Sequence, residues 1–321
     1  MYLNLLRTLL SVKKRDSYPM YSMTYHGDYA FDQLIAQGIT SDDELRTFVK
    51  KQLAVGKTAK FNMPDSGCTV FTAKNETGDI LFARNYDFSY TPSMLVKTSP
   101  KNGYRSFSVI DMSFLGFSKE YLPKGLSGKL PLLAAPYIPA DGINEKGLAA
   151  AILQVPKTIL PNDPNKLTLN TTAIIRLLLD KAATVDEAVA VFQKYNIYFS
   201  QDLYCHYLIA DKSGKSVIVE FWDGEMHIIE ENIASNFYAC NGHNLNGNNM
   251  PCERYETVKS TLDAGDGKLN MTEAASLLCD VGCYNKDGSN RLQWSVIYNL
   301  TSLSGMVFPG RDMSKPHLFH M

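Results

Sequence analysis

The stretch SGCTVFTAKNETGDILFARNYDF, Ser66–Phe88, has the pattern of a β-hairpin. Polar and apolar side chains alternate with period two over Thr69–Ala73, as expected for a strand. The turn residues Asn75–Gly78 follow, and Ile80–Tyr86 supplies a second run of strand-forming residues. The sequence therefore predicts two antiparallel strands joined by a tight polar turn.

This hairpin brings a thiol close to two charged side chains. Cys68 opens the first strand, and Arg84 and Asp87 end the second, close enough to face the thiol. A cysteine on an apolar strand is usually a packed small hydrophobe, but a nearby cation favours the thiolate, and a carboxylate can anchor that cation or orient an amine. No histidine lies near in sequence, so the simplest base for Cys68 is its own α-amino group. That group exists only if the peptide bond after Gly67 is cut.

The composition is that of a globular protein. The chain has 321 residues, of which 45% are hydrophobic and 20% charged, enough to bury a substantial core in one large domain or two small ones. Lys and Arg (32) balance Asp and Glu (33), which argues against a nucleic-acid partner. No window approaches the roughly 20 apolar residues of a membrane span. The N-terminus lacks the charge order of a secretory signal, so we expect a soluble cytoplasmic protein.

The cysteines and histidines do not form a recognisable metal motif. Six cysteines in a chain of this length are too sparse for a disulfide scaffold. Cys205 and His206 are adjacent on a predicted strand and should point to opposite faces. Cys240, His243 and Cys252 occupy an Asn-rich loop without zinc-finger spacing or an apparent fourth ligand. We therefore expect no metal.

The chain divides into a helical leader and a β-rich body. Within residues 1–67, the N-terminus reads as a short amphipathic helix, and Thr40 or Ser41 can cap a helix that runs through Lys51 and can end at Gly56. Strands clustered with helices in the middle and late chain indicate an α+β arrangement. The predicted strands beyond the hairpin are Ser106–Met112, Leu148–Leu153, Leu203–Ala210, Ser216–Trp222, Met226–Glu230, Asn236–Cys240, Leu292–Leu300 and Gly305–Phe308. The predicted helices are Thr171–Lys181, Thr184–Tyr195, Arg254–Leu262 and Thr272–Leu278.

Several segments resemble the choloylglycine hydrolase family, a group of N-terminal-nucleophile (Ntn) hydrolases that includes bile salt hydrolases and penicillin V acylases and, more distantly, acid ceramidases. The hairpin segments Cys-Thr-Val-Phe, Asn-Glu-Thr-Gly-Asp and Ala-Arg-Asn-Tyr-Asp-Phe carry the resemblance first. Downstream segments similar to the family's are Asp141–Leu148, Ala234–Phe237, Glu253–Glu256 and Gln293–Tyr298. The resemblance extends from about Cys68 to Phe308.

The resemblance implies a four-layer αββα sandwich and a set of site residues. By that analogy Cys68 would be both nucleophile and base, Arg84 and Asp87 would tune and orient it, and Arg254 would complete the polar network. Asn236 and the backbone N–H of Gln154 would bind the oxyanion; the family usually has asparagine or tyrosine in place of Gln154. Taken without the resemblance, Asn236 reads as a strand-edge residue and Arg254 as a solvated or ion-paired one.

The implied activity is hydrolysis of a linear amide in an N-acylated small molecule, without a cofactor. The bond between Gly67 and Cys68 would be cut, either by a peptidase or, as the resemblance implies, by attack of the Cys68 thiol on the Gly67 carbonyl. Residues 1–67 would then be a propeptide or small subunit, and residues 68–321 the catalytic domain. Two alternatives stay open: an acyltransferase on the same fold, and a non-catalytic ligand-binding member that remains unprocessed. The substrate is not determined, and homo-oligomerisation is left open.

Overall fold

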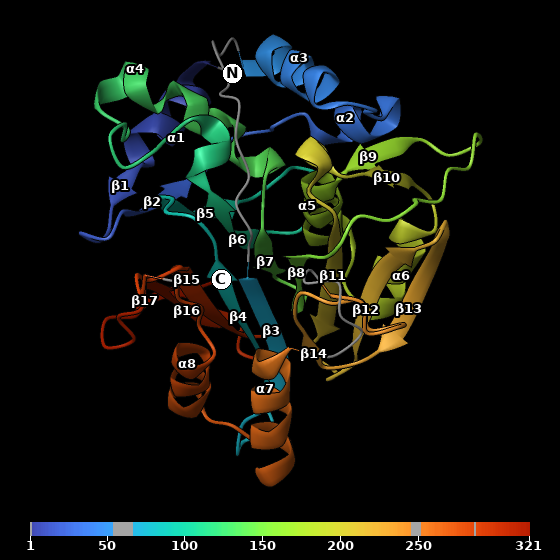
Figure 1. Ribbon diagram of the computed structural model, residues 1–321. Helices are drawn as coiled ribbons and strands as arrows, with labels where there is room; N and C mark the ends of the chain where they lie inside the picture. The colour runs from blue at the N-terminus through green and yellow to red at the C-terminus, as the bar shows by residue number, and fades with distance from the viewer. Residues whose placement is uncertain (1, 54–66, 245–251, 286) are drawn as a thin grey trace.

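The predicted hairpin is confirmed in the computed structural model, which describes residues 2–53, 67–244, 252–285 and 287–321. Strand β3 (Gly67–Lys74) pairs antiparallel with β4 (Ile80–Asp87). The register places Cys68 opposite Tyr86 and Gly67 opposite Asp87. Both faces of the hairpin are buried, because it lies in the middle of the molecule (Figure 1).

The hairpin forms the centre of an antiparallel six-stranded sheet. Its order is β14-β3-β4-β15-β16-β17, and the strands besides the hairpin are β14 (Ile233–Ala234), β15 (Leu292–Asn299), β16 (Ser304–Pro309) and β17 (His317–His320).

The strand predicted at Asn236–Cys240 is wrong. The strand here is the two-residue β14, which ends before Asn236. The chain then turns back on itself, since the Gly242 N–H donates to the Tyr238 carbonyl (2.7 Å) and the Tyr238 N–H to the His243 carbonyl (2.8 Å). The Asn236 amide bonds to groups in other strands, so this segment satisfies its polar groups without a ladder.

The second sheet has nine strands in the order β1-β2-β5-β6-β7-β8-β11-β12-β13. Its pairs are antiparallel except β2 with β5. The strands are β1 (Lys13–Lys14), β2 (Met20–Thr24), β5 (Ser93–Thr98), β6 (Ser106–Asp111), β7 (Asp141–Asn144), β8 (Leu148–Gln154), β11 (Cys205–Asp211), β12 (Ser216–Trp222) and β13 (Glu225–Glu230). A separate parallel pair joins β9 (Thr168–Asn170) to β10 (Asn196–Tyr198). Short 3-10 helices are η1 (Met112–Leu115), η2 (Leu130–Tyr137) and η3 (Ser200–Asp202).

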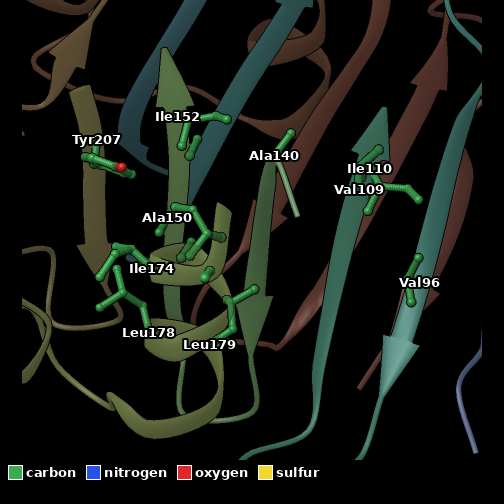
Figure 2. Packing of buried hydrophobic residues seen from close by; sticks show 14 of the residues in the cluster. Val96, Val109, Ile110, Ala140, Ala150, Ile152, Ile174, Leu178, Leu179 and Tyr207 are labelled. Atoms are coloured by element: carbon green, nitrogen blue, oxygen red, sulfur yellow. The ribbon is translucent and has the colours of Figure 1, made fainter. Parts of the chain in front are cut away.

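Helices cover the outer face of each sheet, so the predicted α+β sandwich with αββα layers is confirmed (Figure 1). Helices α5 (Thr171–Lys181) and α6 (Val185–Phe192) pack on the nine-stranded sheet. Helices α7 (Glu253–Ala264) and α8 (Met271–Asp280) pack on the six-stranded sheet. Small side chains at Ala149–Ala151 allow α5 to approach β8, and Figure 2 shows Ile174, Leu178 and Leu179 of α5 directed at this sheet.

The leader contains strands as well as the expected helices. Helices α1 (Tyr2–Ser11), α2 (Phe31–Gln37) and α3 (Asp42–Leu53) are present. The segment Tyr18–Asp28, which is polar in sequence, contains strand β2, whose Met20, Tyr21 and Met23 are buried. Only the tertiary fold provides the partner strand β5 that makes this segment a strand. Ser41 accepts a hydrogen bond from the Glu44 N–H at the start of α3 (3.3 Å). The predicted end at Gly56 lies outside the described residues.

A buried polar cluster ties the leader to the body. The Tyr29 hydroxyl donates to both carboxylate oxygens of Asp180 (2.8 and 2.7 Å), and Asp180 pairs with Arg176 (2.8 Å). All three side chains are nearly inaccessible to solvent. Burial raises the pKa of Asp180, and the Arg176 guanidinium opposes that rise. Tyr29 therefore supplies hydrogen bonds to a carboxylate that water cannot reach.

We expect Tyr29→Phe to lower the free energy of unfolding by about 1.5–3 kcal/mol, the contribution of a hydrogen bond to a charged group. Denaturant unfolding at neutral pH measures this change. The matched control is Tyr121→Phe, at a side chain that is exposed. Equal unfolding midpoints for both variants would contradict the anchoring role of Tyr29.

Candidate active site

Cys68 lies at the start of β3 with its side chain on the face that points between the two sheets. It is 3% exposed, yet it lines a cavity of about 120 Å³. The rest of the lining is mostly apolar and comes from the hairpin, from η1 and η2, from the ends of β8 and β11, and from helix α3 of the leader. The thiol thus faces a space that a small apolar group could enter.

Arg84 lies on the same face of the hairpin as the thiol, as expected. Its Nη2 is 3.9 Å from the Cys68 Sγ and donates to the Ile152 carbonyl (2.9 Å). Its Nη1 pairs with Asp141 on β7. Burial alone would lower the pKa of Arg84, but the Asp141 carboxylate raises it above its usual value. A permanent cation is therefore held beside the sulfur.

Asp141 is the residue that sequence reasoning missed. It opens the segment Asp141–Leu148, which is named in the sequence analysis only for its similarity to the family. In the structure its carboxylate also accepts hydrogen bonds from the Tyr298 hydroxyl (2.5 Å) and from the Trp294 indole N–H (3.3 Å). Trp294 in turn stacks on Tyr86, with ring centroids 3.9 Å apart. The signal in the sequence was its position at the start of a segment that resembles the family's.

Asp87 does not face the thiol, which corrects the expectation for this residue. It is opposite Gly67 in the register, so its side chain points to the other face of β4 from Arg84. Its Oδ1 accepts the Cys283 N–H (2.7 Å), and its Oδ2 is buried without a hydrogen-bond partner among the described residues. Burial raises the pKa of Asp87 to about 6, opposed by the Arg254 guanidinium. Asp87 is thus a buried acceptor beside the peptide bond that precedes Cys68.

Asn236 follows β14 and contacts both the backbone of Cys68 and the end of β8. Its Oδ1 accepts the Cys68 N–H (2.6 Å), and its Nδ2 donates to the Gln154 carbonyl (2.8 Å). The Arg254 Nη2 also donates to Oδ1 (2.8 Å). Because Oδ1 receives two donors, the orientation of the amide is fixed and one N–H of Nδ2 is left for another acceptor.

Arg254, in the first turn of α7, contacts strand β3 as well as Asn236. Its Nη1 donates to the Cys68 carbonyl (2.5 Å) and to the Thr69 hydroxyl (2.9 Å). The reading of Arg254 as a solvated residue is therefore wrong, since its guanidinium binds β3 and Asn236.

Gln154 ends β8 and lines the cavity with Cys68. The neighbouring Val155 N–H donates to the Tyr204 carbonyl across the ladder (2.9 Å). Hydrogen-bonded and non-hydrogen-bonded pairs alternate in antiparallel strands, so Gln154 and Cys205 form a non-hydrogen-bonded pair. The backbone N–H of Gln154 consequently points away from β11.

Two further thiols lie close to this centre, and no sequence pattern predicted them here. Cys205 lines the same cavity. A Cβ added to Gly67 would lie 2.7 Å from the Cys283 Sγ, so Cys283 leaves no space for a side chain at Gly67. Burial raises the pKa of the Cys68 thiol, the Arg84 guanidinium opposes that rise, and the Asp87 carboxylate adds to it. The uncleaved chain therefore favours the protonated thiol.

The residues implied by the resemblance thus lie together, in two groups on either side of β3. Cys68, Arg84 and Gln154 face the cavity, while Asp87 and Arg254 lie around the Gly67–Cys68 peptide bond; Asn236 connects the two groups. The described residues hold no group of three His, Cys, Asp or Glu side chains placed to bind a metal ion. Among those same residues, no helix is long and apolar enough to cross a bilayer.

Comparison with known proteins identifies the class. Residues 68–260 match the family model described as linear amide C–N hydrolases, choloylglycine hydrolase family. This match covers more than half of the chain, which therefore belongs to that family of amide hydrolases. The match begins at Cys68.

Individual relatives agree with this assignment. The chain is 36% identical to a penicillin V acylase of Pectobacterium atrosepticum over 99 residues, 27% of this chain and 26% of the relative. It is 26% identical to a bile salt hydrolase/transferase of Clostridium perfringens over 214 residues, 63% of each chain. The aligned segments thus span less than two thirds of these relatives.

Solved structures support the fold. A conjugated bile acid hydrolase from Clostridium perfringens superposes with a TM-score of 0.59 at 15% identity, covering 79% of this chain and 92% of that one. A penicillin V acylase from Agrobacterium tumefaciens gives a TM-score of 0.51 at 20% identity, covering 78% and 85%. The sandwich described above is therefore the Ntn-hydrolase fold.

The raised pKa of Asp87 predicts a pH-dependent stability. The pKa of about 6 in the folded chain lies above the usual aspartate pKa of 3.8. Protonation therefore favours the folded chain, and this contribution is complete below the unfolded pKa and lost as pH rises through about 6. In the uncut Cys68→Ala background we expect Asp87→Asn to raise the free energy of unfolding by about 2–3 kcal/mol at pH 8, and by little at pH 4.

Denaturant unfolding across this pH range measures the difference. Asp266→Asn, at a side chain that is 95% exposed, is the matched control and should change little at either pH. A pH-independent effect of Asp87→Asn would show that the carboxylate is not held protonated by burial.

Proposed function

We propose that Cys68 is the nucleophile of a linear amide hydrolase and that it becomes the N-terminal residue when the Gly67–Cys68 bond is cut. The observation that carries this proposal is the surroundings of Cys68: a cation 3.9 Å from its sulfur, a cavity on one side, and a buried carboxylate beside its backbone nitrogen. The thiol serves both the cut and the later hydrolysis.

The cut requires only groups of this chain and water. The Cys68 Sγ attacks the carbonyl carbon of Gly67, and the C–N bond breaks as the nitrogen takes up a proton, leaving a thioester between Gly67 and Cys68. Water then hydrolyses the thioester, giving a Gly67 carboxylate and a free Cys68 thiol and amine. Asp87 lies beside this bond, and its raised pKa allows it to carry a proton near pH 6.

The new α-amino group then has partners. Before the cut, the Cys68 nitrogen donates to Asn236 Oδ1, while Asp87 Oδ2 is unpartnered nearby. An ammonium has three donors, so it can keep the bond to Asn236 and add one to Asp87. Its unperturbed pKa of about 7.7–8.0 is suited to moving protons at neutral pH. Asp87 is thus proposed to orient the amine, and Arg84 to favour the thiolate.

Hydrolysis of the substrate follows the same order of bond making and bond breaking as the cut. The Cys68 sulfur attacks the substrate carbonyl, the Cys68 amine passes the thiol proton to the leaving nitrogen, and water releases the acyl group. The free N–H of Asn236 Nδ2 and the backbone N–H of Gln154 are proposed to bind the oxyanion. Such donors typically contribute about 2.7–4 kcal/mol each to the transition state. Arg254 fixes Asn236 and the Cys68 carbonyl.

The leader, residues 1–67, is proposed to remain as a small subunit after the cut rather than to dissociate from the catalytic domain, 68–321. Strand β2 fills a place between β1 and β5 in the nine-stranded sheet, and Tyr29 binds the buried Asp180. Four residues of α3, Asp42, Leu45, Arg46 and Val49, line the same cavity as Cys68. Loss of the leader would expose an apolar strand edge and open the cavity.

The cavity favours a substrate with an apolar acyl group. Leu45, Phe88, Leu115 and Ile138 are among its lining residues, so the acyl part of an N-acyl amide would find hydrophobic contacts there. The relatives' names, penicillin V acylase and bile salt hydrolase/transferase, suggest the first amides to test. Because the second name includes a transferase, these assays should also look for transfer of the acyl group to an added amine. We also propose that the protein works in the cytoplasm, where its six free cysteines would stay reduced.

Mass spectrometry of the purified protein tests the cut. Wild type under neutral reducing conditions should give two masses that correspond to residues 1–67 and 68–321, and both should elute together on gel filtration. Cys68→Ala should give only the full-length mass and no amidase activity on a panel of N-acyl amides. Full-length wild type that stays inert toward the panel would favour a non-catalytic binding protein.

Gly67→Ala should slow the cut by about tenfold or more, since a cost of about 1.4 kcal/mol to the transition state suffices for that factor. The new methyl group would lie 2.7 Å from the Cys283 Sγ and 3.3 Å from the Asp87 Cβ, which displaces the Gly67 carbonyl. Adding Cys283→Ala should restore most of the rate. Gly128→Ala, where an added Cβ meets nothing closer than 4.0 Å, is the control. Unchanged cleavage in Gly67→Ala would contradict the proposed geometry.

A further inference from the structure

The first helix leaves one apolar stripe without a partner. In α1, Leu9 and Thr8 are buried against the body, whereas Tyr2, Leu3, Leu6 and Leu10 are 79, 69, 42 and 61% exposed. The spacings of three and four residues between Leu3, Leu6 and Leu10 place them on one side of the helix. Helix α1 lies on the outside of the molecule, beside β2 near the edge of the nine-stranded sheet (Figure 1).

Helix α4 (Gly125–Lys129) extends the apolar surface. The Lys129 Nζ donates to the Leu9 and Val12 carbonyls at the end of α1 (3.4 and 3.1 Å), so the two helices lie side by side. Next to this contact Tyr121, Leu126 and Leu130 are 54, 47 and 39% exposed. Residues 2–15 and 119–130 together are called the α1–α4 face below. Exposed apolar side chains on two neighbouring helices are a feature of interaction surfaces.

The same face carries positive charge although the chain as a whole has a net charge of −1. Residues 2–15 contain four basic and no acidic side chains, and residues 119–130 contain three basic and one acidic. A groove of about 740 Å³ runs beside α1, and its lining includes Arg7, Lys13, Arg15 and Lys97 but no Asp or Glu among the described residues. Leu10 belongs to both the stripe and the groove.

We propose that the α1–α4 face docks on a membrane surface that contains anionic phospholipid. Leucine and tyrosine side chains on a short helix suit burial at the boundary between headgroups and acyl chains. Lysines and arginines beside them suit the negative surface potential of anionic lipid. The helix lies on the surface and does not cross the bilayer, in agreement with its length of 10 residues.

Element η2 connects the α1–α4 face to the cavity that contains Cys68. Element η2 directly follows α4 and packs on α1, and its Ala134 and Tyr137 line the cavity that contains Cys68. A molecule docked through α1 and α4 therefore lies with one wall of its cavity close to the bilayer, where apolar acyl compounds accumulate. The docking itself does not depend on the proposed chemistry of Cys68.

Vesicle sedimentation tests the proposal with the full chain. We expect binding to vesicles of phosphatidylcholine with one third phosphatidylglycerol, at least about tenfold weaker binding to phosphatidylcholine alone, and release at high salt. Leu3→Ser with Leu6→Ser, and separately Lys13→Glu with Lys14→Glu, should each reduce binding by about tenfold or more. All four positions are exposed, so the fold should be unaffected, and the unfolding temperature checks this.

Matched controls change the same residue types elsewhere on the surface. Ile159→Ser with Ile228→Ser removes two exposed apolar side chains, and Lys259→Glu with Lys268→Glu reverses two exposed charges; both pairs should bind vesicles like wild type. The proposal is overturned by failure of wild type to bind either vesicle, or by equal losses in the controls. A dimer in light scattering that the Leu3→Ser, Leu6→Ser variant abolishes, without vesicle binding, would assign the face to a second copy of the chain instead.

Discussion

The ion pair between Arg84 and Asp141 joins the two sheets at the centre of the molecule. Arg84 belongs to β4 of the six-stranded sheet and Asp141 to β7 of the nine-stranded sheet, and both side chains are fully buried. Removing one partner of a buried pair leaves a charge without compensation, which typically costs about 3–5 kcal/mol. Tyr298 and Trp294 bring two more donors from the six-stranded sheet to the same carboxylate. The distance between the sheets, and hence the cavity in front of Cys68, depends on this pair.

The hairpin carries different groups of side chains on its two faces. On the inner face, Cys68 and Arg84 border the cavity. On the outer face, Asp87 and Arg254 lie around the peptide bond that precedes Cys68. Successive residues of a strand point to opposite faces. The Cys68 thiol can therefore face the cavity while the groups around the Cys68 nitrogen lie on the other side of the strand. Asn236 links the two sides through the Cys68 N–H and the Gln154 carbonyl.

The leader, residues 1–67, contributes to the same fold and the same cavity. Its strand β2 continues the nine-stranded sheet, its Tyr29 binds a buried carboxylate, and its helix α3 closes one side of the cavity. The apolar stripe of its first helix, α1, is exposed to solvent and lies beside the basic groove. The leader therefore contributes to the fold, to the cavity wall and to the outer surface, which is more than a removable segment would require.

Local sequence signals were sufficient to predict several helices and strands. The hairpin, the helix Thr171–Lys181 and the strand Ser216–Trp222 follow from periodicity, turn residues and capping, which involve neighbours along the chain. The family motifs also located the residues around Cys68, although their roles remain proposals. Only the tertiary structure decided that β2 is a strand, that Asn236 lies in a bend, that Asp87 points away from the thiol and that Asp141 binds Arg84. These features depend on partners distant in sequence, and no local pattern specifies which distant segment will supply the hydrogen bond, the opposite charge or the neighbouring strand.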